Sequence, residues 1–248
     1  MDLTKIYRGI PLLSKRTANS VVPAELVVPL SRSDACIVGI GVDTSPSTYA
    51  NDAIDVIEEG GRTCIEQIRE DPILRSQIEL RPYYFGQTNS VVTFPAYTPA
   101  SQFKMPRIPQ SNGTYICELY VAMIEDAARH MHELSRNHDR DIRGAVIFIF
   151  SDFQRTTEKH YTLEDAMRAK QLAREYRINL IMVGCGNEVD EQTIHQLGTP
   201  GQIVYMKSAL DFREFFSWLY PSLREFSMSM PGQKVRTPPL LGQSLELE

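Results

Sequence analysis

The sequence predicts an α/β fold, namely a doubly wound, mostly parallel sheet with one antiparallel edge strand and helices on both faces. Short apolar runs alternate with segments of helical periodicity, which is typical of such sheets. Two of the runs, residues 35–42 and 145–150, are almost wholly apolar, as expected for strands buried on both faces. Both runs end at polar residues, and open α/β sheets bind ligands at that end of their strands.

The 248 residues suffice for one large domain with extensions. We expect an N-terminal arm at residues 1–33, a domain at 34–228 and a tail containing proline and glycine at 229–248. The arm either packs on the domain or docks on another chain. From Met230 onward, the prolines and glycines predict a disordered or extended tail.

The net charge of −5 argues against nucleic acid as the main partner, because such binding depends on contacts to phosphate. The longest apolar run, residues 145–150, is far shorter than the roughly 20 residues that span a bilayer. The N-terminus lacks the basic and apolar segments of a signal peptide. We therefore expect a soluble protein without a membrane partner.

The four cysteines are scattered through apolar strand and helix patterns, which favours small buried hydrophobic residues over disulfides or zinc ligands. A reducing compartment, the cytoplasm, fits this usage best. The four are Cys36, Cys64, Cys117 and Cys185.

Residues 49–71 have the apolar stripe of a helix that ends at Asp71-Pro72. Gly60-Gly61 weakens this helix by about 1 kcal/mol per glycine. A close approach of the helix backbone to the sheet would compensate for that loss.

Two strand-like runs follow, at residues 78–85 and 90–94, and their short polar connector predicts a hairpin. Residues 95–110 carry four prolines and are expected to form a surface loop. A long helix then begins near Thr114, with its apolar stripe between Ile116 and Leu134.

The second half of the chain alternates regularly after the strand at 145–150. Helices are predicted over 163–176, 188–197 and 208–226, and strands over 179–184 and 203–206. The aromatic residues of the last helix are expected to be mostly core. His130, His132 and His138 do not share one helical face and are expected at the surface.

Polar side chains gather at the ends of the two most apolar strands. If those strands are neighbours, Asp43 and Asp152 face each other across the crevice between them. Ser45 and Ser47 follow the first strand, and Thr114 heads a helix that could reach the same crevice. The hydroxyls could simply cap helices. Together, however, two carboxylates and three hydroxyls form an all-oxygen ligand set suited to Mg²⁺ or Mn²⁺, with Ca²⁺ as a further option.

Asp43-Thr-Ser45-Pro-Ser47 resembles the D-x-S-x-S motif of von Willebrand factor A-type (VWA) domains. Thr114 and Asp152 fall where that family places the threonine and second aspartate of its metal-ion-dependent adhesion site, and the resemblance covers roughly residues 34–227. It implies an interaction domain whose bound cation holds an acidic residue of a protein partner. Two positions depart from the family, which commonly has glycine where this chain has Pro46 and Phe153.

Arg69-Glu-Asp-Pro72 and Asn112-Gly-Thr114 resemble the small TerY-like VWA proteins of bacterial tellurium-resistance and stress-response clusters. That resemblance implies an intracellular interaction protein with kinase-like or phosphatase-like partners, in a stress-response or defence system.

The main interpretation is therefore a non-enzymatic domain with Asp43, Ser45, Ser47, Thr114 and Asp152 as metal ligands. The rival is a metal-dependent phosphohydrolase with Asp43 as nucleophile. That chemistry usually needs a second acid two residues on and a lysine near the transferred phosphate, whereas position 45 is serine. A third alternative is a VWA scaffold without metal.

Overall fold

The computed structural model describes residues 34–45, 53–85, 91–93, 96–109, 113, 115–137, 141–154, 160–230, 233–241 and 243–247. The N-terminal arm predicted at 1–33 lies outside this range. Among the described helices, none combines the length and apolar character needed to cross a membrane.

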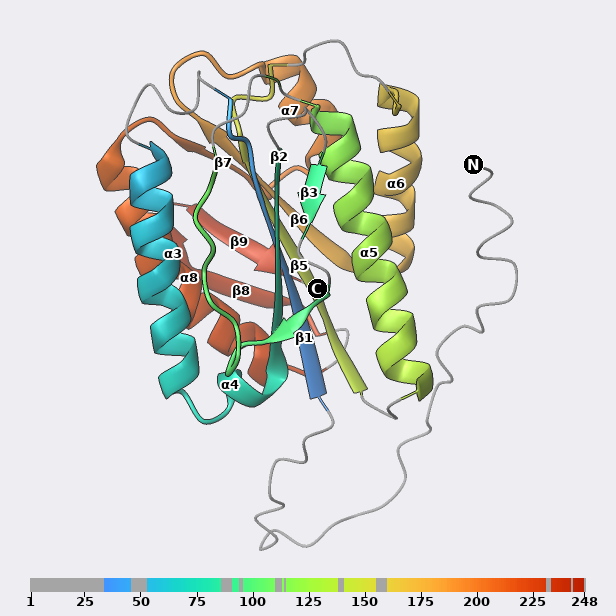
Figure 1. The fold of residues 1–248 in the computed structure, drawn as a ribbon, viewed down its shortest axis with the longest axis vertical. Helices are drawn as coiled ribbons and strands as arrows, with labels where there is room; N and C mark the ends of the chain where they lie inside the picture. Colours follow the sequence, from blue (N-terminus) through green and yellow to red (C-terminus); the bar gives the residue numbers. More distant parts are fainter. Residues whose placement is uncertain are drawn as a thin grey trace, which may run out of the picture. The chain divides into compact units, whose positions relative to one another are not determined.

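The main sheet has the strand order β3-β2-β1-β5-β6-β7, and the five strands from β2 to β7 in this order run parallel (Figure 1). The parallel strands are β1 (Asp34–Val42), β2 (Ile78–Phe85), β5 (Asp141–Ser151), β6 (Ile178–Cys185) and β7 (Ile203–Met206). At one edge, β3 (Val91–Thr93) pairs with β2 in the antiparallel sense. The predicted α/β class, with an antiparallel edge strand, is confirmed.

A second short antiparallel strand was not predicted. β4 (Thr98–Pro99) also pairs with β2, within the segment expected to be a surface loop. Several apolar side chains of this segment are buried, so it covers part of the core. They are Tyr97, Ala100, Phe103 and Ile108. The prolines interrupt the sequence periodicity, which is why these anchors could not be recognised.

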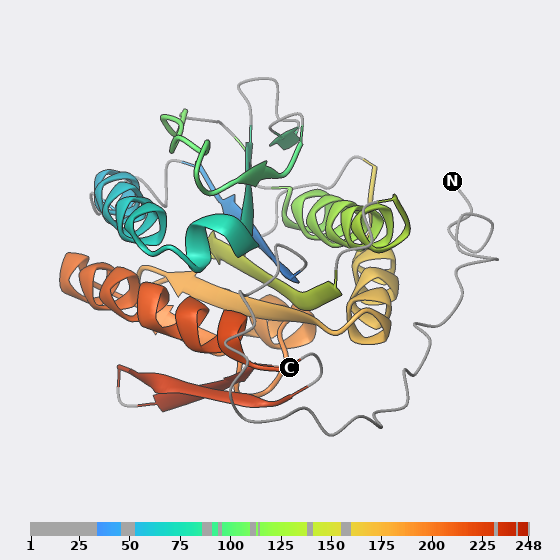
Figure 2. The ribbon, with the colours of Figure 1, turned by 90° about the horizontal axis from the view of Figure 1, so that it is seen from below.

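Helices cover both faces of the sheet, as Figure 2 shows. One face carries α3 (Ala53–Glu70), α4 (Leu74–Gln77) and α8 (Ala209–Met228). The other carries α5 (Ile116–Asn137), α6 (Leu163–Glu175) and α7 (Glu191–Leu197). Successive residues of β1 alternate between the two cores, with Val38 and Ile40 in the first and Ala35 and Ile37 in the second. All four cysteines are buried and none forms a disulfide, as predicted.

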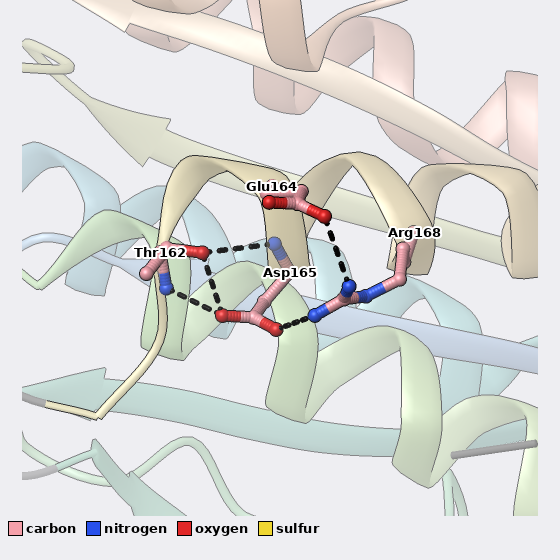
Figure 3. Close-up of polar contacts among 4 residues, drawn as sticks. All are labelled: Thr162, Glu164, Asp165 and Arg168. Carbon is pink, nitrogen blue, oxygen red and sulfur yellow. Dashed lines mark hydrogen bonds and ion pairs between the residues drawn. The ribbon is translucent and has the colours of Figure 1, made fainter. Parts of the chain in front are cut away.

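The start of α6 shows how local chemistry sets an element boundary (Figure 3). The Thr162 hydroxyl accepts from the Asp165 backbone N–H at 3.2 Å, and the Asp165 carboxylate accepts from the Thr162 N–H at 2.8 Å. Arg168 pairs with Glu164 at 3.1 Å and also with Asp165. This capping box satisfies N–H groups that a helix start leaves without partners, so α6 begins directly after Thr162.

The C-terminal segment corrects the sequence prediction of a disordered or extended tail. Its described residues form a hairpin of β8 (Val235–Leu240) and β9 (Gln243–Leu247). Leu240, Leu245 and Leu247 are buried, and Trp218 of α8 donates its indole N–H to the Pro238 carbonyl at 2.8 Å. Prolines end helices but are tolerated in edge strands, and the leucines supply one apolar face. The domain boundaries at residues 34 and 228 stay a prediction.

The close approach that Gly60 permits is to another helix and not, as predicted, to the sheet. A Cβ at Gly60 would lie 2.2 Å from Cδ2 of Phe216, so the glycine lets α3 approach α8 rather than the sheet. A Cβ at Gly61 would lie 3.2 Å from Cε of Met105, the mobile end of a flexible side chain. The two adjacent glycines therefore have different steric surroundings.

We expect Gly60→Ala to destabilise the protein by about 1–3 kcal/mol, because the overpacking against Phe216 outweighs the gain in helix propensity. Gly61→Ala is the matched control and should be neutral or stabilising by up to about 1 kcal/mol. Urea unfolding of the two variants provides the comparison. Equal stability of the two would contradict a close approach at Gly60.

Asp71 joins α4 to α8 at the end of α3. Its Oδ1 accepts from the Ile73 and Leu74 N–H groups at 2.8 and 3.1 Å. Its Oδ2 accepts from the Tyr220 hydroxyl at 3.1 Å and the Arg224 Nε at 3.0 Å. Burial acts to raise the pKa of this carboxyl, but the four hydrogen bonds outweigh burial and lower it.

Because the folded-state pKa of Asp71 lies below its unfolded value, its stabilising effect is complete above the unfolded pKa and is lost as pH falls through the folded pKa. We expect Asp71→Asn to lower the free energy of unfolding by about 1.5–3 kcal/mol at pH 7. An amide has one accepting oxygen, so it cannot serve both the backbone N–H groups at one carboxylate oxygen and the Tyr220 and Arg224 donors at the other. The unfolding free energies of the wild type and of Asp71→Asn should converge as the pH is lowered from 7 to 3. A difference that does not change with pH would show that the charge of Asp71 contributes nothing.

Candidate metal centre

The neighbour relation on which the predicted site depends is present. β1 and β5 are adjacent and parallel, with Val42 opposite Phe150, and the Asp43 N–H donates to the Phe150 carbonyl at 2.8 Å. From β1 the chain passes through α3 to β2 on one side, and from β5 through α6 to β6 on the other. The strand order therefore reverses between β1 and β5, where sheets of this class open a ligand-binding crevice.

Asp43 stands at the carboxyl end of β1 and is fully buried. Its Oδ1 accepts from the Ser45 backbone N–H at 2.9 Å, which closes a tight turn after the strand. Its Oδ2 accepts from the Ser151 hydroxyl of β5 at 2.7 Å. Both carboxylate oxygens are thus held, one by the loop and one by the neighbouring strand.

Burial raises the pKa of the Asp43 carboxyl above its ordinary value. Hydrogen bonds from Ser151 and Ser45 act in the opposite direction, and the nearby charge of Asp152 raises the pKa further. Two buried carboxylates side by side are unfavourable when both are ionised. A divalent cation between them would remove that cost, so the donor set fits a hard cation.

Asp152 lies in a turn directly after β5 and is almost fully buried. Its Oδ1 accepts from the Gln154 N–H at 3.0 Å, and its carbonyl accepts from the Asp190 N–H at 2.8 Å. The Gln154 side chain donates to the Glu188 carbonyl at 2.7 Å. The turn is therefore tied to the loop that follows β6.

Phe153 adopts a left-handed backbone conformation, with φ of 58°. A glycine would adopt this conformation without strain, and the family commonly has glycine at this position. The Phe153 ring is fully buried in the core on the α5 and α6 side. Its ring therefore anchors the turn from within the core.

Of the five predicted ligands, the structure brings Asp43, Ser45 and Asp152 to one edge of the sheet. Ser47 and Thr114 lie outside the described residues, and the assignment of all five as ligands stays a prediction. Within the described ranges, no group of three His, Cys, Asp or Glu side chains is arranged to hold a metal ion. The predicted set has only two such groups and takes its other ligands from hydroxyls.

Sequence reasoning missed two residues at this edge. Ser151, the residue before Asp152, is not among the predicted ligands, yet its hydroxyl donates to the Asp43 carboxylate. Cys185, at the end of β6, is a buried thiol. Burial raises its pKa well above the ordinary value, and the charges of Asp43 and Asp152 raise it further. No sequence pattern indicates either relation, because both depend on how the strands align.

His130 also differs from the sequence prediction, which placed it at the surface. Its side chain is only 19% exposed, lies 2.7 Å from the Glu79 carboxylate and stacks on the Tyr97 ring at 4.6 Å between centroids. Through these two contacts, His130 links α5 to β2 and to the segment that contains β4.

No family model matches the chain, and no curated protein matches it. Solved structures show the same fold. They include the pilus adhesin SpaC from Lactobacillus rhamnosus GG, with a TM-score of 0.56 and 9% identity over 78% of this chain and 30% of that chain. The ArnB paralog VWA2 from Sulfolobus acidocaldarius matches with a TM-score of 0.52 and 14% identity over 76% and 45% of the two chains.

A third match is proximal thread matrix protein 1 from the mussel byssus, solved with a zinc-occupied MIDAS motif. It has a TM-score of 0.52 and 13% identity over 76% of this chain and 47% of that chain. This chain thus spans between 30% and 47% of the length of these three proteins. At such low identity the matches establish the fold alone, and that fold is the fold of a VWA domain.

Proposed function

We propose that this chain is a non-enzymatic protein-interaction domain that holds a divalent cation and uses it to bind an acidic residue of a partner. Asp43, Ser45, Ser47, Thr114 and Asp152 would hold the cation. The observation that carries the proposal is the pair of buried carboxylates, Asp43 and Asp152, at the point where the strand order reverses.

The oxygen-only donor set favours Mg²⁺, with Mn²⁺ or Ca²⁺ as alternatives. Two carboxylates balance the charge of a divalent cation, and the hydroxyls add none. A cation held in this way keeps its affinity for a further oxygen ligand, which a partner's Asp or Glu would supply. The byssus protein with a metal at its MIDAS motif supports the assignment by analogy of fold.

The finer part of the proposal rests on sequence resemblance. It places the protein among the TerY-like VWA proteins of bacterial tellurium resistance and stress response, in the cytoplasm, with a kinase-like or phosphatase-like partner. The buried cysteines, none of which forms a disulfide, are compatible with a reducing compartment.

The buried position of Asp43 argues against the phosphohydrolase alternative. A nucleophile must reach the phosphorus atom itself, whereas Asp43 is fully buried and both of its carboxylate oxygens accept hydrogen bonds. A metal ligand needs to reach only the cation. The burial of Asp43 therefore favours binding over nucleophilic catalysis.

We expect Mg²⁺ to stabilise the chelator-treated wild-type protein and to leave Asp43→Asn unaffected. At a concentration about 100 times Kd, binding contributes about 2.7 kcal/mol, which corresponds to a rise in Tm of about 5–10 °C for a chain of this size. Differential scanning fluorimetry with and without Mg²⁺, supported by calorimetric titration, measures the effect.

The same variant tests the electrostatic argument in the absence of metal. Without a cation, Asp43→Asn should be at least as stable as the wild type, because it removes a buried charge beside Asp152. Equal Mg²⁺ shifts in both proteins would refute the site. No shift in either protein with Mg²⁺, Mn²⁺ or Ca²⁺ would favour the metal-free scaffold.

We expect the loaded protein to select carboxylates. On an array of peptides that differ only at one central residue, binding in Mg²⁺ should favour Asp and Glu over Asn and Gln by at least about tenfold, as expected for a charge-assisted contact worth about 1.4 kcal/mol or more. Chelator should abolish the preference, and Asp43→Asn should lack it. Turnover of a generic phosphate ester that depends on Asp43 would instead support the hydrolase.

A further inference from the structure

We propose that Ser151 is a positioning residue of this site, whose hydroxyl fixes the Asp43 carboxylate in the orientation that a cation requires. The inference rests on the proposed function. Ser151 is not one of the five predicted ligands, and its role follows from three features of the structure: its hydrogen bonds, the strand register and the strained residue that follows Asp152.

The hydrogen bonds of Ser151 determine where its proton points. Its Oγ accepts from the Phe153 backbone N–H at 2.8 Å and lies 2.7 Å from Oδ2 of Asp43. The amide can only donate and the carboxylate can only accept, so the hydroxyl proton must point toward Asp43. Ser151 thus relays a hydrogen bond from the Phe153 backbone to the carboxylate.

The register of β1 and β5 explains why serine occupies this position. Val42 pairs with Phe150, so the next residues along the two strands, Asp43 and Ser151, come opposite each other. Asp152 stands one residue further along. The hydroxyl therefore lies beside the first carboxylate, where it can hold Oδ2 while the Ser45 N–H holds Oδ1.

The conformation of Phe153 keeps this relay in place. A non-glycine residue with φ of 58° costs on the order of 1–3 kcal/mol and persists only where the surroundings hold it. Here the fully buried ring supplies that support. The backbone N–H of this anchored residue donates to the Ser151 hydroxyl at 2.8 Å.

Hydrogen-bonded partners of metal ligands typically contribute about 10–100-fold to metal affinity. We therefore expect Ser151→Ala to raise the Kd for Mg²⁺ by about 10–100-fold in calorimetric titration of the full chain. Ser151→Thr retains the hydroxyl and should bind Mg²⁺ nearly as the wild type does. Ser151→Cys is close in size but a weak donor, and should fall between the two.

A matched control separates positioning from general stability. Ser222 of α8 is also buried and donates its hydroxyl to the Trp218 carbonyl at 2.8 Å, on an element that supplies none of the predicted ligands. Ser222→Ala should lower the metal-free Tm but leave the Kd for Mg²⁺ unchanged. If Ser151→Ala behaves in the same way, its role is only structural and the proposal is overturned.

The remaining outcomes also discriminate. If Ser151→Ala does not fold, the comparison of Ser151→Cys with Ser151→Thr decides, and equal Kd values for these two variants would overturn the proposal. If the wild-type protein and the Ser151→Ala variant bind Mg²⁺ with equal affinity, the role of Ser151 is refuted but the proposed function is left intact. Wild-type protein that binds no divalent cation overturns both.

Discussion

The burial of Asp43 near Asp152 is the constraint on which the candidate site depends. Hydrogen bonds from Ser45 and Ser151 stabilise the Asp43 carboxylate, yet its pKa stays raised, so they do not fully offset burial and the neighbouring charge. The two residues lie where the strand order reverses between β1 and β5, the position at which sheets of this class bind ligands. The proposed cation would offset the cost of burying both carboxylates there.

The surrounding architecture serves to bring elements close to that edge. A Cβ at Gly41 would lie 2.5 Å from Sδ of Met123, so the glycine lets α5 pack tightly against β1. α5 is the helix that Thr114 precedes in the sequence. On the other face, Gly60 lets α3 approach α8 in the same way. Gly41 thus sets the distance between α5 and the sheet, and Gly60 sets the distance between two helices on the same face.

Periodicity and composition predicted most of the fold, because each element carries its own signal. β2 and β7 have the predicted bounds, and most aromatic residues of α8 are buried, as predicted. The apolar runs likewise placed Asp43, Ser45 and Asp152 directly after β1 and β5, where the structure has them, and their role as ligands stays a prediction. What escaped prediction depends on contacts between elements: the Ser151 hydrogen bond needs the register of two strands, and the C-terminal hairpin needs the surface of α8 to bury its leucines. The left-handed backbone conformation of Phe153 could not be predicted, because this conformation favours glycine and is uncommon for an aromatic residue.

The hydrogen bonds of Asp43 also bear on how tightly a cation would be held and how strongly it would attract a partner. A carboxylate that already accepts from Ser45 and Ser151 donates less electron density to a metal ion than a carboxylate without such bonds. The cation would therefore keep more of its positive charge for an outside oxygen. Under this proposal Ser151 has two opposite effects on cation affinity. It orients the carboxylate, which strengthens binding, and it lowers the donor strength of the carboxylate, and orientation is the larger effect because Ser151→Ala is expected to weaken binding. Both effects fit the proposed function, in which the site would bind its cation and leave one coordination position to a partner's carboxylate.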